Sequence, residues 1–218
     1  MMICLDDVLS PEQAIGLQKT LEDSTLFEPG QRTAGGAAKR AKNNLQAVAT
    51  RPEIRTVLNQ VRERLQAHSE FQRFAMPKHL GRLMVSRYEP GMTYGHHFDA
   101  AFIEGRRTDL SFTLFLNDPG SYEGGELEIV TPMGRQAIKL PAGCAIVYPS
   151  DHLHGVLPVT QGHRLAVVGW IESRVRLAEH RQTLYDFSRA LADLPDADSD
   201  AMLRLKMVRN NLRRLWEE

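Results

Sequence analysis

The sequence predicts a mainly β protein with flanking helices. Between residues 80 and 174, short runs of β-branched and aromatic residues alternate with turn signals such as EPGM, NDPGSYEGG and TPMG. Apolar residues at helical spacing precede and follow this region. Short strands with such punctuation indicate an antiparallel sandwich or barrel. We therefore expect a helical buttress and loop over 1–79, a β core over 80–174 and a helical extension over 175–218.

Two helices are predicted ahead of the core. Ser10 is a suitable N-cap, Pro11 suits the first turn, and Gln13 completes a capping box, so the first helix runs from residue 11 to about residue 23. Residues 27–44 show no apolar period and are rich in Gly, Ala and basic residues, which indicates a loop. A second helix follows the Arg-Pro pair at 51 and 52, with apolar side chains at helical spacing: Ile54, Val57, Leu58, Val61 and Leu65.

Within the core, six runs are predicted to be strands: 83–88, 110–116, 126–130, 137–140, 144–149 and 164–171. Behind the core, a helix is expected over about 177–192, and the acidic stretch 194–200 separates it from a last amphipathic helix. The apolar stripe predicted for that last helix consists of Met202, Leu205, Leu212 and Leu215.

The composition narrows the class of protein. The 218 residues include 27 basic and 27 acidic ones, a balance that argues against a protein built to coat nucleic acid or an anionic membrane. The two cysteines, Cys4 and Cys144, lack a metal-binding spacing and argue against a disulfide framework. No apolar run approaches the roughly 20 residues of a membrane span, and the first residues are acidic where a secretory signal is basic. We expect a cytoplasmic protein.

The stretch GHHFDAAF at 95–102 contains a candidate metal site. Side chains alternate faces along an extended chain, so His97 and Asp99 share one face and His96 takes the other. A third ligand can come from PSDHLHGV, where His152 and His154 differ by two positions and alternation does not choose between them. Two imidazoles and one carboxylate on one face form the facial triad typical of non-haem Fe(II) oxygenases.

Arg164 supplies the matching anion site. It opens the apolar run LAVV, and a guanidinium buried there needs an anionic partner, either a structural carboxylate or a ligand. Its planar fork can bind a carboxylate through two hydrogen bonds. 2-Oxoglutarate has both required parts, an α-keto acid that chelates iron and a distal carboxylate for the arginine.

These residues resemble a known family. HFD at 97–99 followed by LHGVLPVTQGHR at 153–164 is similar to the Fe(II)/2-oxoglutarate dioxygenases of the prolyl-hydroxylase type. The flanking stretches RYEPGMTYGHHFDAA, DLSFTLFLNDP and YEGGELEI resemble the PKHD-type hydroxylases within that superfamily, and the likeness covers nearly the whole chain.

The resemblance implies a double-stranded β-helix (jelly roll), iron held by His97, Asp99 and His154, and 2-oxoglutarate anchored by Arg164. It implies an oxidoreductase that hydroxylates an unactivated C–H bond with dioxygen, releases succinate and CO2, and uses L-ascorbate (vitamin C) to keep iron reduced. Prolyl or lysyl side chains, or a small molecule, are the implied substrates. A cupin-like module that binds a metal or a small acid without turnover is the alternative.

Several assignments stay open at this point. Tyr88 either borders the cosubstrate or is a core tyrosine. Lys42, Asn43, Asn44 and Gln46 either line the substrate entrance or form a solvated loop, and we favour the loop. The last helix carries a basic face that we expect to be solvated. Its residues are Arg204, Lys206, Arg209, Arg213 and Arg214. A homo-oligomer is compatible with the sequence.

Overall fold

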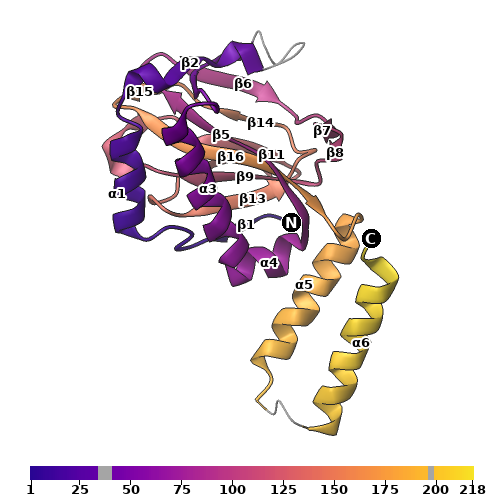
Figure 1. Cartoon of the computed structure of the whole chain (residues 1–218). Helices are drawn as coiled ribbons and strands as arrows, with labels where there is room; N and C mark the ends of the chain where they lie inside the picture. Colours follow the sequence, from indigo (N-terminus) through magenta and orange to yellow (C-terminus); the bar gives the residue numbers. More distant parts are fainter. Residues whose placement is uncertain (34–40, 196–198) are drawn as a thin grey trace.

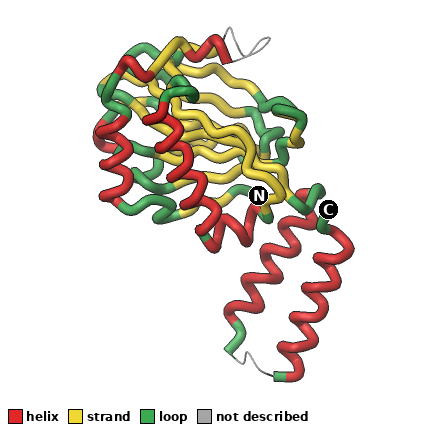
Figure 2. Tube along the Cα trace, in the orientation of Figure 1, coloured by secondary structure: helices red, strands yellow, loops and turns green. Residues whose placement is uncertain are grey.

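Two antiparallel sheets form the body of the protein (Figures 1 and 2). The structure is a computed structural model that describes residues 1–33, 41–195 and 199–218. The larger sheet has, in spatial order, β1 (Ile3–Leu5), β13 (Ala145–Pro149), β9 (Leu110–Phe115), β16 (Arg164–Ser173), β5 (Pro77–Tyr88), β4 (Leu45–Ala47) and β2 (Phe27–Pro29). The smaller sheet has β12 (Gly134–Ile138), β11 (Leu127–Thr131), β14 (His154–Val156), β6 (Thr93–His97) and β3 (Lys42–Asn43).

Shorter elements close the ends of this body. The pairs β10 (Glu123–Gly124) with β15 (Val159–Gln161) and β7 (Phe102–Ile103) with β8 (Arg106–Arg107) form two-stranded sheets. Single 3₁₀ turns lie at Ser24–Leu26, Gly30–Thr33 and Pro119–Ser121. All six predicted strand runs are found in the two sheets, which confirms the mainly β class with flanking helices.

Alternation along the larger sheet separates its two faces. On β16, Leu165 and Val167 point outward into the main hydrophobic core, while Arg164 and Val168 point inward and line a cavity. The outward face packs against α1 (Pro11–Thr20), α3 (Pro52–Ala67) and α4 (Ser69–Ala75), which contribute buried side chains to the same core. The helices therefore cover the outside of this sheet, and its inner face is left for the site.

The N-terminal helix begins as its sequence predicts, although it ends at Thr20 and not near residue 23. The Ser10 side chain accepts a hydrogen bond from the Gln13 amide at 3.3 Å, and the Gln13 side chain accepts from the Ser10 amide at 3.0 Å. Helix α3 likewise begins at Pro52 and buries Ile54, Val57, Val61 and Leu65. Helix α4 was not predicted, because it is only seven residues long and a single residue separates it from the end of α3.

The prediction of a loop over residues 27–44 is wrong for most of the residues described there. β2 pairs with β4, and β3 pairs with β6 in the other sheet. These strands are two or three residues long, too short to show alternation, and their hydrogen-bond partners lie far away in the chain. The part of the predicted loop at 34–40 lies outside the described residues.

The C-terminal extension is a helical hairpin that projects from the body (Figure 1). It consists of α5 (Ala178–Asp193) and α6 (Asp200–Trp216). The acidic stretch predicted to separate these helices lies between them, and its residues 196–198 are outside the described residues. His180 on α5 stacks on Trp216 of α6, with ring centroids 4.1 Å apart. The predicted stripe on α6 is correct for Met202 and Leu212 and wrong for Leu215, which is 75% exposed.

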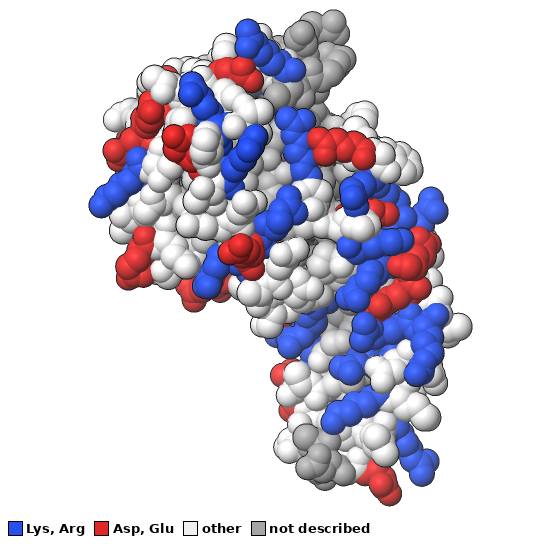
Figure 3. Space-filling view, viewed as in Figure 1, with Lys and Arg blue, Asp and Glu red and all other residues white. Residues whose placement is uncertain are grey.

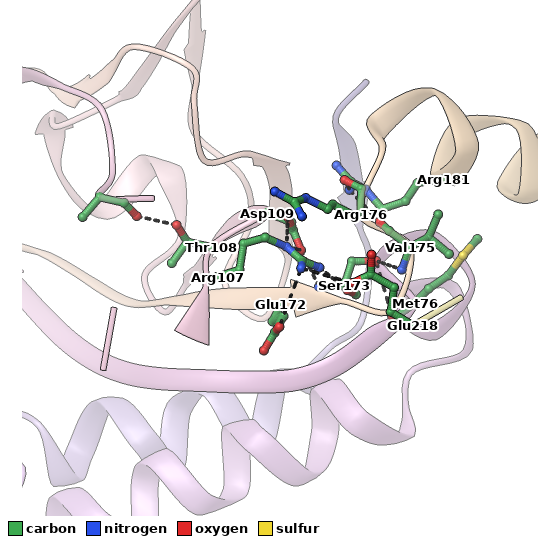
Figure 4. A network of polar contacts seen from close by, with 11 residues as sticks. Met76, Arg107, Thr108, Asp109, Glu172, Ser173, Val175, Arg176, Arg181 and Glu218 are labelled. Carbon is green, nitrogen blue, oxygen red and sulfur yellow. Dashed lines mark hydrogen bonds and ion pairs between the residues drawn. The ribbon is translucent and has the colours of Figure 1, made fainter. Parts of the chain in front are cut away.

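A polar network fastens the hairpin to the body (Figure 4). The Arg107 Nε donates to Asp109 Oδ1 at 2.8 Å, and its Nη2 donates to the Ser173 carbonyl at 2.9 Å. Arg107 also pairs with Glu218 at 3.4 Å, so the last residue of the chain is held beside β8. Arg181 on α5 donates to the carbonyl of Val175 at 2.9 Å. Both ends of the hairpin are thus tied to strand β16 and its neighbours.

Lys and Arg side chains gather on the hairpin and over its junction with the body (Figure 3). Of the predicted basic face of α6, Arg204, Arg213 and Arg214 are exposed, and Lys206 and Arg209 are partly buried. Among the described helices, none combines the length and the apolar character that a membrane crossing requires.

Tyr185 couples the hairpin to the body, and its replacement tests that coupling. Its ring packs edge-on against Phe74 of α4 at 5.3 Å and its hydroxyl donates to Glu70. We expect Tyr185→Ala to lower the free energy of unfolding by about 3 kcal/mol through the lost ring contacts. Tyr185→Phe, which loses only the hydroxyl, should cost about 1 kcal/mol.

Urea denaturation followed by circular dichroism measures both changes. Leu215→Ala is the matched control, because its side chain is exposed on the same hairpin and should change stability little. An unchanged unfolding midpoint for Tyr185→Ala would show that the hairpin is not coupled to the stability of the body.

Candidate active site

A cavity of about 250 Å³ lies between the two sheets. The larger sheet lines it with the inward residues of β5, β9 and β16, and the smaller sheet lines it with residues of β6 and β14. The polar side chains that line it gather in two places. One group is a cluster of two histidines and an aspartate, and the other surrounds Arg164.

The cluster consists of His97, Asp99 and His154, whose candidate ligand atoms all lie within 4.8 Å of one another. His154 on β14 lies directly opposite His97 on β6 in the strand register, which places the two imidazole rings 4.4 Å apart. Asp99 follows β6, and its Oδ2 is 3.8 Å from the His154 Nε2. The structure thus brings together the three side chains that the sequence singled out.

Backbone carbonyls orient both rings. The Nδ1 of His97 is 2.9 Å from the Gly95 carbonyl oxygen, and the Nδ1 of His154 is 2.9 Å from that of His152. A carbonyl oxygen only accepts, so each Nδ1 carries the proton and each Nε2 keeps its lone pair. Both lone pairs are available to a metal ion, and the hydrogen bonds on the far side of each ring fix its orientation.

Asp99 is held from the larger sheet. The Ser111 hydroxyl on β9 donates to the Asp99 Oδ2 at 2.6 Å and lies 2.8 Å from the Ser150 hydroxyl. The Asp99 amide donates to the Ser150 carbonyl at 3.2 Å. The second carboxylate oxygen, Oδ1, is left for a ligand. Nothing in the sequence marked Ser111, because its role depends on the pairing of β9 with β13.

The two neighbouring histidines take no part in the cluster. His96 points to the other face of β6, where its Nε2 is 2.6 Å from Glu128 Oε1. Arg135 donates to the same oxygen at 2.9 Å. His152 lies outside the cluster with its Nδ1 3.0 Å from Asp151 Oδ1. Their contacts are with carboxylates on the outside of the smaller sheet and in a turn.

Burial lowers the pKa of His97 to about 4, with the neighbouring His154 adding to the effect. The Tyr94 ring stacks on His97 with centroids 3.8 Å apart and covers the imidazole from solvent. His97 is therefore neutral at physiological pH, which is the form that binds a metal.

Arg164 lies at the centre of the second polar group and is 1% exposed. Its guanidinium lies between the rings of Tyr88, at 5.4 Å, and Phe115, at 5.1 Å. Within the described part of the chain, its Nε and Nη2 have no hydrogen-bond partner. The sequence-based alternative of a structural carboxylate is therefore not met among the described residues.

Gly125 makes room for this arginine. A Cβ at position 125 would lie 3.2 Å from the Arg164 Cδ and 2.8 Å from the Val159 Cγ2, and the backbone there has a φ of +68°. Only glycine adopts that conformation readily and permits the approach. Nothing in the sequence marked Gly125 for this role.

Tyr88 lies opposite Arg164 in the register of β5 and β16 and is fully buried at the same end of the cavity. Burial raises the pKa of its phenol, so the hydroxyl stays protonated. The prediction of a solvated loop at Lys42, Asn44 and Gln46 is wrong: they are 5%, 4% and 3% exposed and line the cavity. Their burial comes from pairing β3 and β4 with distant strands.

These residues fit an iron ion and an acid. Two neutral imidazoles and one carboxylate are the donor set of a non-haem Fe(II) centre, and they leave the remaining coordination positions open to the cavity. Buried guanidinium nitrogens without protein partners match a carboxylate ligand, since an unpaired buried charge is costly.

The comparisons with known proteins agree with this site. The model of the 2OG-Fe(II) oxygenase superfamily matches residues 83–172, a segment that contains His97, Asp99, His154 and Arg164. The chain is 45% identical to a PKHD-type hydroxylase of Maricaulis maris over 223 residues, covering 100% of each chain.

Solved structures show the same fold at low sequence identity. A prolyl-4-hydroxylase of Pseudomonas putida is similar with a TM-score of 0.54 and 20% identity, over 79% of this chain and 92% of that one. A prolyl hydroxylase of Trichoplax adhaerens, in complex with a peptide fragment of the hypoxia inducible factor oxygen degradation domain, gives a TM-score of 0.56 and 16% identity over 84% and 86%.

The fold is therefore the double-stranded β-helix of the 2-oxoglutarate oxygenases, whose cofactor is Fe(II) and whose cosubstrate is 2-oxoglutarate. Within that superfamily, the chain belongs to the PKHD-type hydroxylases. It is an oxidoreductase that uses dioxygen, and the alternative of a binding module without turnover is set aside.

The lowered pKa of His97 makes the metal-free protein sensitive to acid. Between about pH 6.5 and pH 4 the unfolded chain binds a proton at this position and the folded chain does not, so stability falls as the pH falls. The expected loss is at most about 3 kcal/mol. Urea unfolding of the metal-free protein across this range measures it.

His97→Asn should remove this part of the pH dependence. His79→Asn, at an exposed position of β5, is the matched control and should leave it in place. A pH dependence that is identical in the parent and in His97→Asn would contradict the buried neutral histidine.

Proposed function

We propose that His97, Asp99 and His154 bind Fe(II), that Arg164 anchors 2-oxoglutarate beside Tyr88, and that the enzyme hydroxylates a C–H bond of its substrate. The observation that carries this proposal is the pair of polar groups in one cavity. One is a facial donor set of the kind that binds Fe(II), and the other is a buried guanidinium whose Nε and Nη2 have no partner among the described residues.

When bound, iron and 2-oxoglutarate supply the oxidising power, using dioxygen and releasing succinate and CO2. The protein contributes geometry. The carbonyls of Gly95 and His152 keep both Nε2 lone pairs directed at the metal position, and Ser111 fixes the orientation of Asp99. Arg164 sets the direction from which the acid approaches, and the buried walls keep bulk water out.

The size of the cavity restricts the class of substrate. Because the cavity measures about 250 Å³ and the cosubstrate takes part of it, we infer that only a side chain or the end of a small molecule enters. Prolyl hydroxylases share the fold, which favours a prolyl or lysyl side chain of a peptide as one form of the substrate.

The remaining assignments belong to the same proposal. Residues 80–174 hold the site, 1–79 buttress it, and 175–218 form an extension. Ascorbate serves to re-reduce iron, the enzyme works in the cytoplasm, nucleic acid is not a partner, and the chain is able to form a homo-oligomer. The zero net charge supports the absence of a nucleic-acid partner.

Replacing the ligands tests the metal assignment. His97→Ala, Asp99→Ala and His154→Ala should each abolish 2-oxoglutarate-dependent succinate formation, because the facial set needs all three donors. His96→Ala and His152→Ala are matched controls and should keep most of it. Fe(II) binding by each variant is measured alongside. If the His152 variant loses iron and the His154 variant keeps it, the ligand assignment is wrong.

Replacing Arg164 tests the cosubstrate assignment. A charge-assisted hydrogen bond contributes roughly 1.5–3 kcal/mol. Arg164→Ala should therefore weaken 2-oxoglutarate binding about 10- to 100-fold. Arg164→Lys keeps the positive charge but not the planar guanidinium, so its affinity for 2-oxoglutarate should lie between those of the parent and of Arg164→Ala. Fe(II) binding without cosubstrate should stay the same in all three proteins.

The readout is an anaerobic titration of the Fe(II)-loaded protein with 2-oxoglutarate, followed through the visible absorption of the chelate. An Arg164→Ala protein with parental affinity for 2-oxoglutarate would make Arg164 a structural residue.

A further inference from the structure

A cleft of about 260 Å³ lies where the C-terminal hairpin meets the body, and it shares no lining residue with the active-site cavity. Its walls come from α4, from the residue after β16 and from both helices of the hairpin. Four of its lining residues are arginines: Arg73, Arg174, Arg209 and Arg213. Figure 3 shows Lys and Arg side chains gathered over this junction.

Acidic residues offset only part of this charge. Glu217 is the one acidic residue among the described residues that line the cleft. Its carboxylate is shared between Arg174, whose Nη1 is 3.6 Å away, and Arg213, whose Nη2 is 3.3 Å away. Arg73 pairs with Glu70 at 2.9 Å. With both acids counted, these side chains still include two more positive charges than negative ones.

Two of the guanidinium groups also lack hydrogen bonds. The Nε of Arg174 and the Nε of Arg209 are buried and have no hydrogen-bond partner among the described residues. A buried donor without an acceptor is costly, and an anion that accepts two parallel hydrogen bonds is the strongest partner for a guanidinium. The cleft is open to such an anion, because the side chains of Arg73, Arg174 and Arg213 are 37%, 38% and 44% exposed.

The arginines approach the cleft from three parts of the chain. Arg73 belongs to α4 of the body, Arg174 follows β16, and Arg209 and Arg213 lie one turn apart on α6. A tetrahedral phosphate group offers at least three acceptor oxygens to donors on different sides, whereas a planar carboxylate offers two in one plane. A phosphate monoester carries a charge of about −1.5 to −2 at pH 7, which matches the surplus of two positive charges.

We propose that this cleft binds a phosphate group, carried by free phosphate or by a small phosphate monoester. The bound group accepts hydrogen bonds from Arg209 of the hairpin and from Arg73 and Arg174 of the body. Its binding therefore ties the hairpin to the body and stabilises the folded chain.

The test is isothermal titration calorimetry of the full chain at neutral pH and constant ionic strength. Inorganic phosphate and glycerol 3-phosphate are the probes, and succinate, a carboxylate dianion, and glycerol are the controls. At least one phosphate probe should bind about 10-fold or more tightly than succinate, and glycerol should not bind. The tighter of the two probes identifies free phosphate or the monoester as the ligand.

Variants assign the binding to the cleft. Arg209→Gln should weaken phosphate binding at least about 10-fold, and Arg209→Lys, which keeps the charge but not the planar guanidinium, should lie between this variant and the parent. Arg204→Gln makes the same change at an exposed position of α6 outside the cleft and should bind as the parent does. Arg164→Ala should keep a site of parental affinity, because Arg164 lines the other cavity.

Urea unfolding supplies a second readout. The midpoint of each variant without ligand shows that it is folded. The tighter phosphate probe should raise the midpoint of the parent and of Arg204→Gln, and should raise that of Arg209→Gln less.

Four results overturn the proposal: no binding of either phosphate probe, equal affinity for succinate, parental affinity in Arg209→Gln, or an equal loss of affinity in Arg204→Gln. Loss of all binding in Arg164→Ala would also overturn it, because the phosphate would then occupy the active-site cavity. The titrations use protein without iron or 2-oxoglutarate, so their outcome is independent of the proposed function.

Discussion

The register between β6 and β14 is the constraint on which the site depends. It sets His154 opposite His97 and is possible because the residue between His154 and Val156 is glycine. A Cβ at Gly155 would lie 2.8 Å from the Tyr94 carbonyl oxygen and 3.2 Å from the His96 amide nitrogen. A slip of one residue would turn His97 to the outside of the sheet and His96 to the inside.

The two sheets contribute different residues to the site. The smaller sheet carries the histidines, while the larger sheet carries Arg164 and, through Ser111, fixes Asp99. The spacing between the two histidines and Arg164 is therefore a spacing between the two sheets. Side chains from both sheets pack in the layer that maintains it: Phe115, Leu127, Ile129, Ile146 and Tyr148. Substitutions in that layer would change the chemistry without touching a ligand.

The features that could be predicted from the sequence are those that depend on residues close together in the chain. The capping box at Ser10, the stripe of α3 and the alternation of HFD are local, and the structure has each of them. The burial of Lys42 was not predictable in this way, because it depends on Tyr94, fifty-two positions away, and on the pairing of β3 with β6. The same reason explains Ser111 and the loop prediction at 27–44. The exposed Leu215 differs because α6 has a neighbour on one side only.

Binding of 2-oxoglutarate at Arg164, as proposed, would also stabilise the folded chain. A ligand that binds the folded chain and not the unfolded one shifts the folding equilibrium in proportion to its concentration. If the acid binds at Arg164 as proposed, a cell rich in it would hold more of the chain in its folded form, and a cell depleted of it would expose more chain to proteolysis.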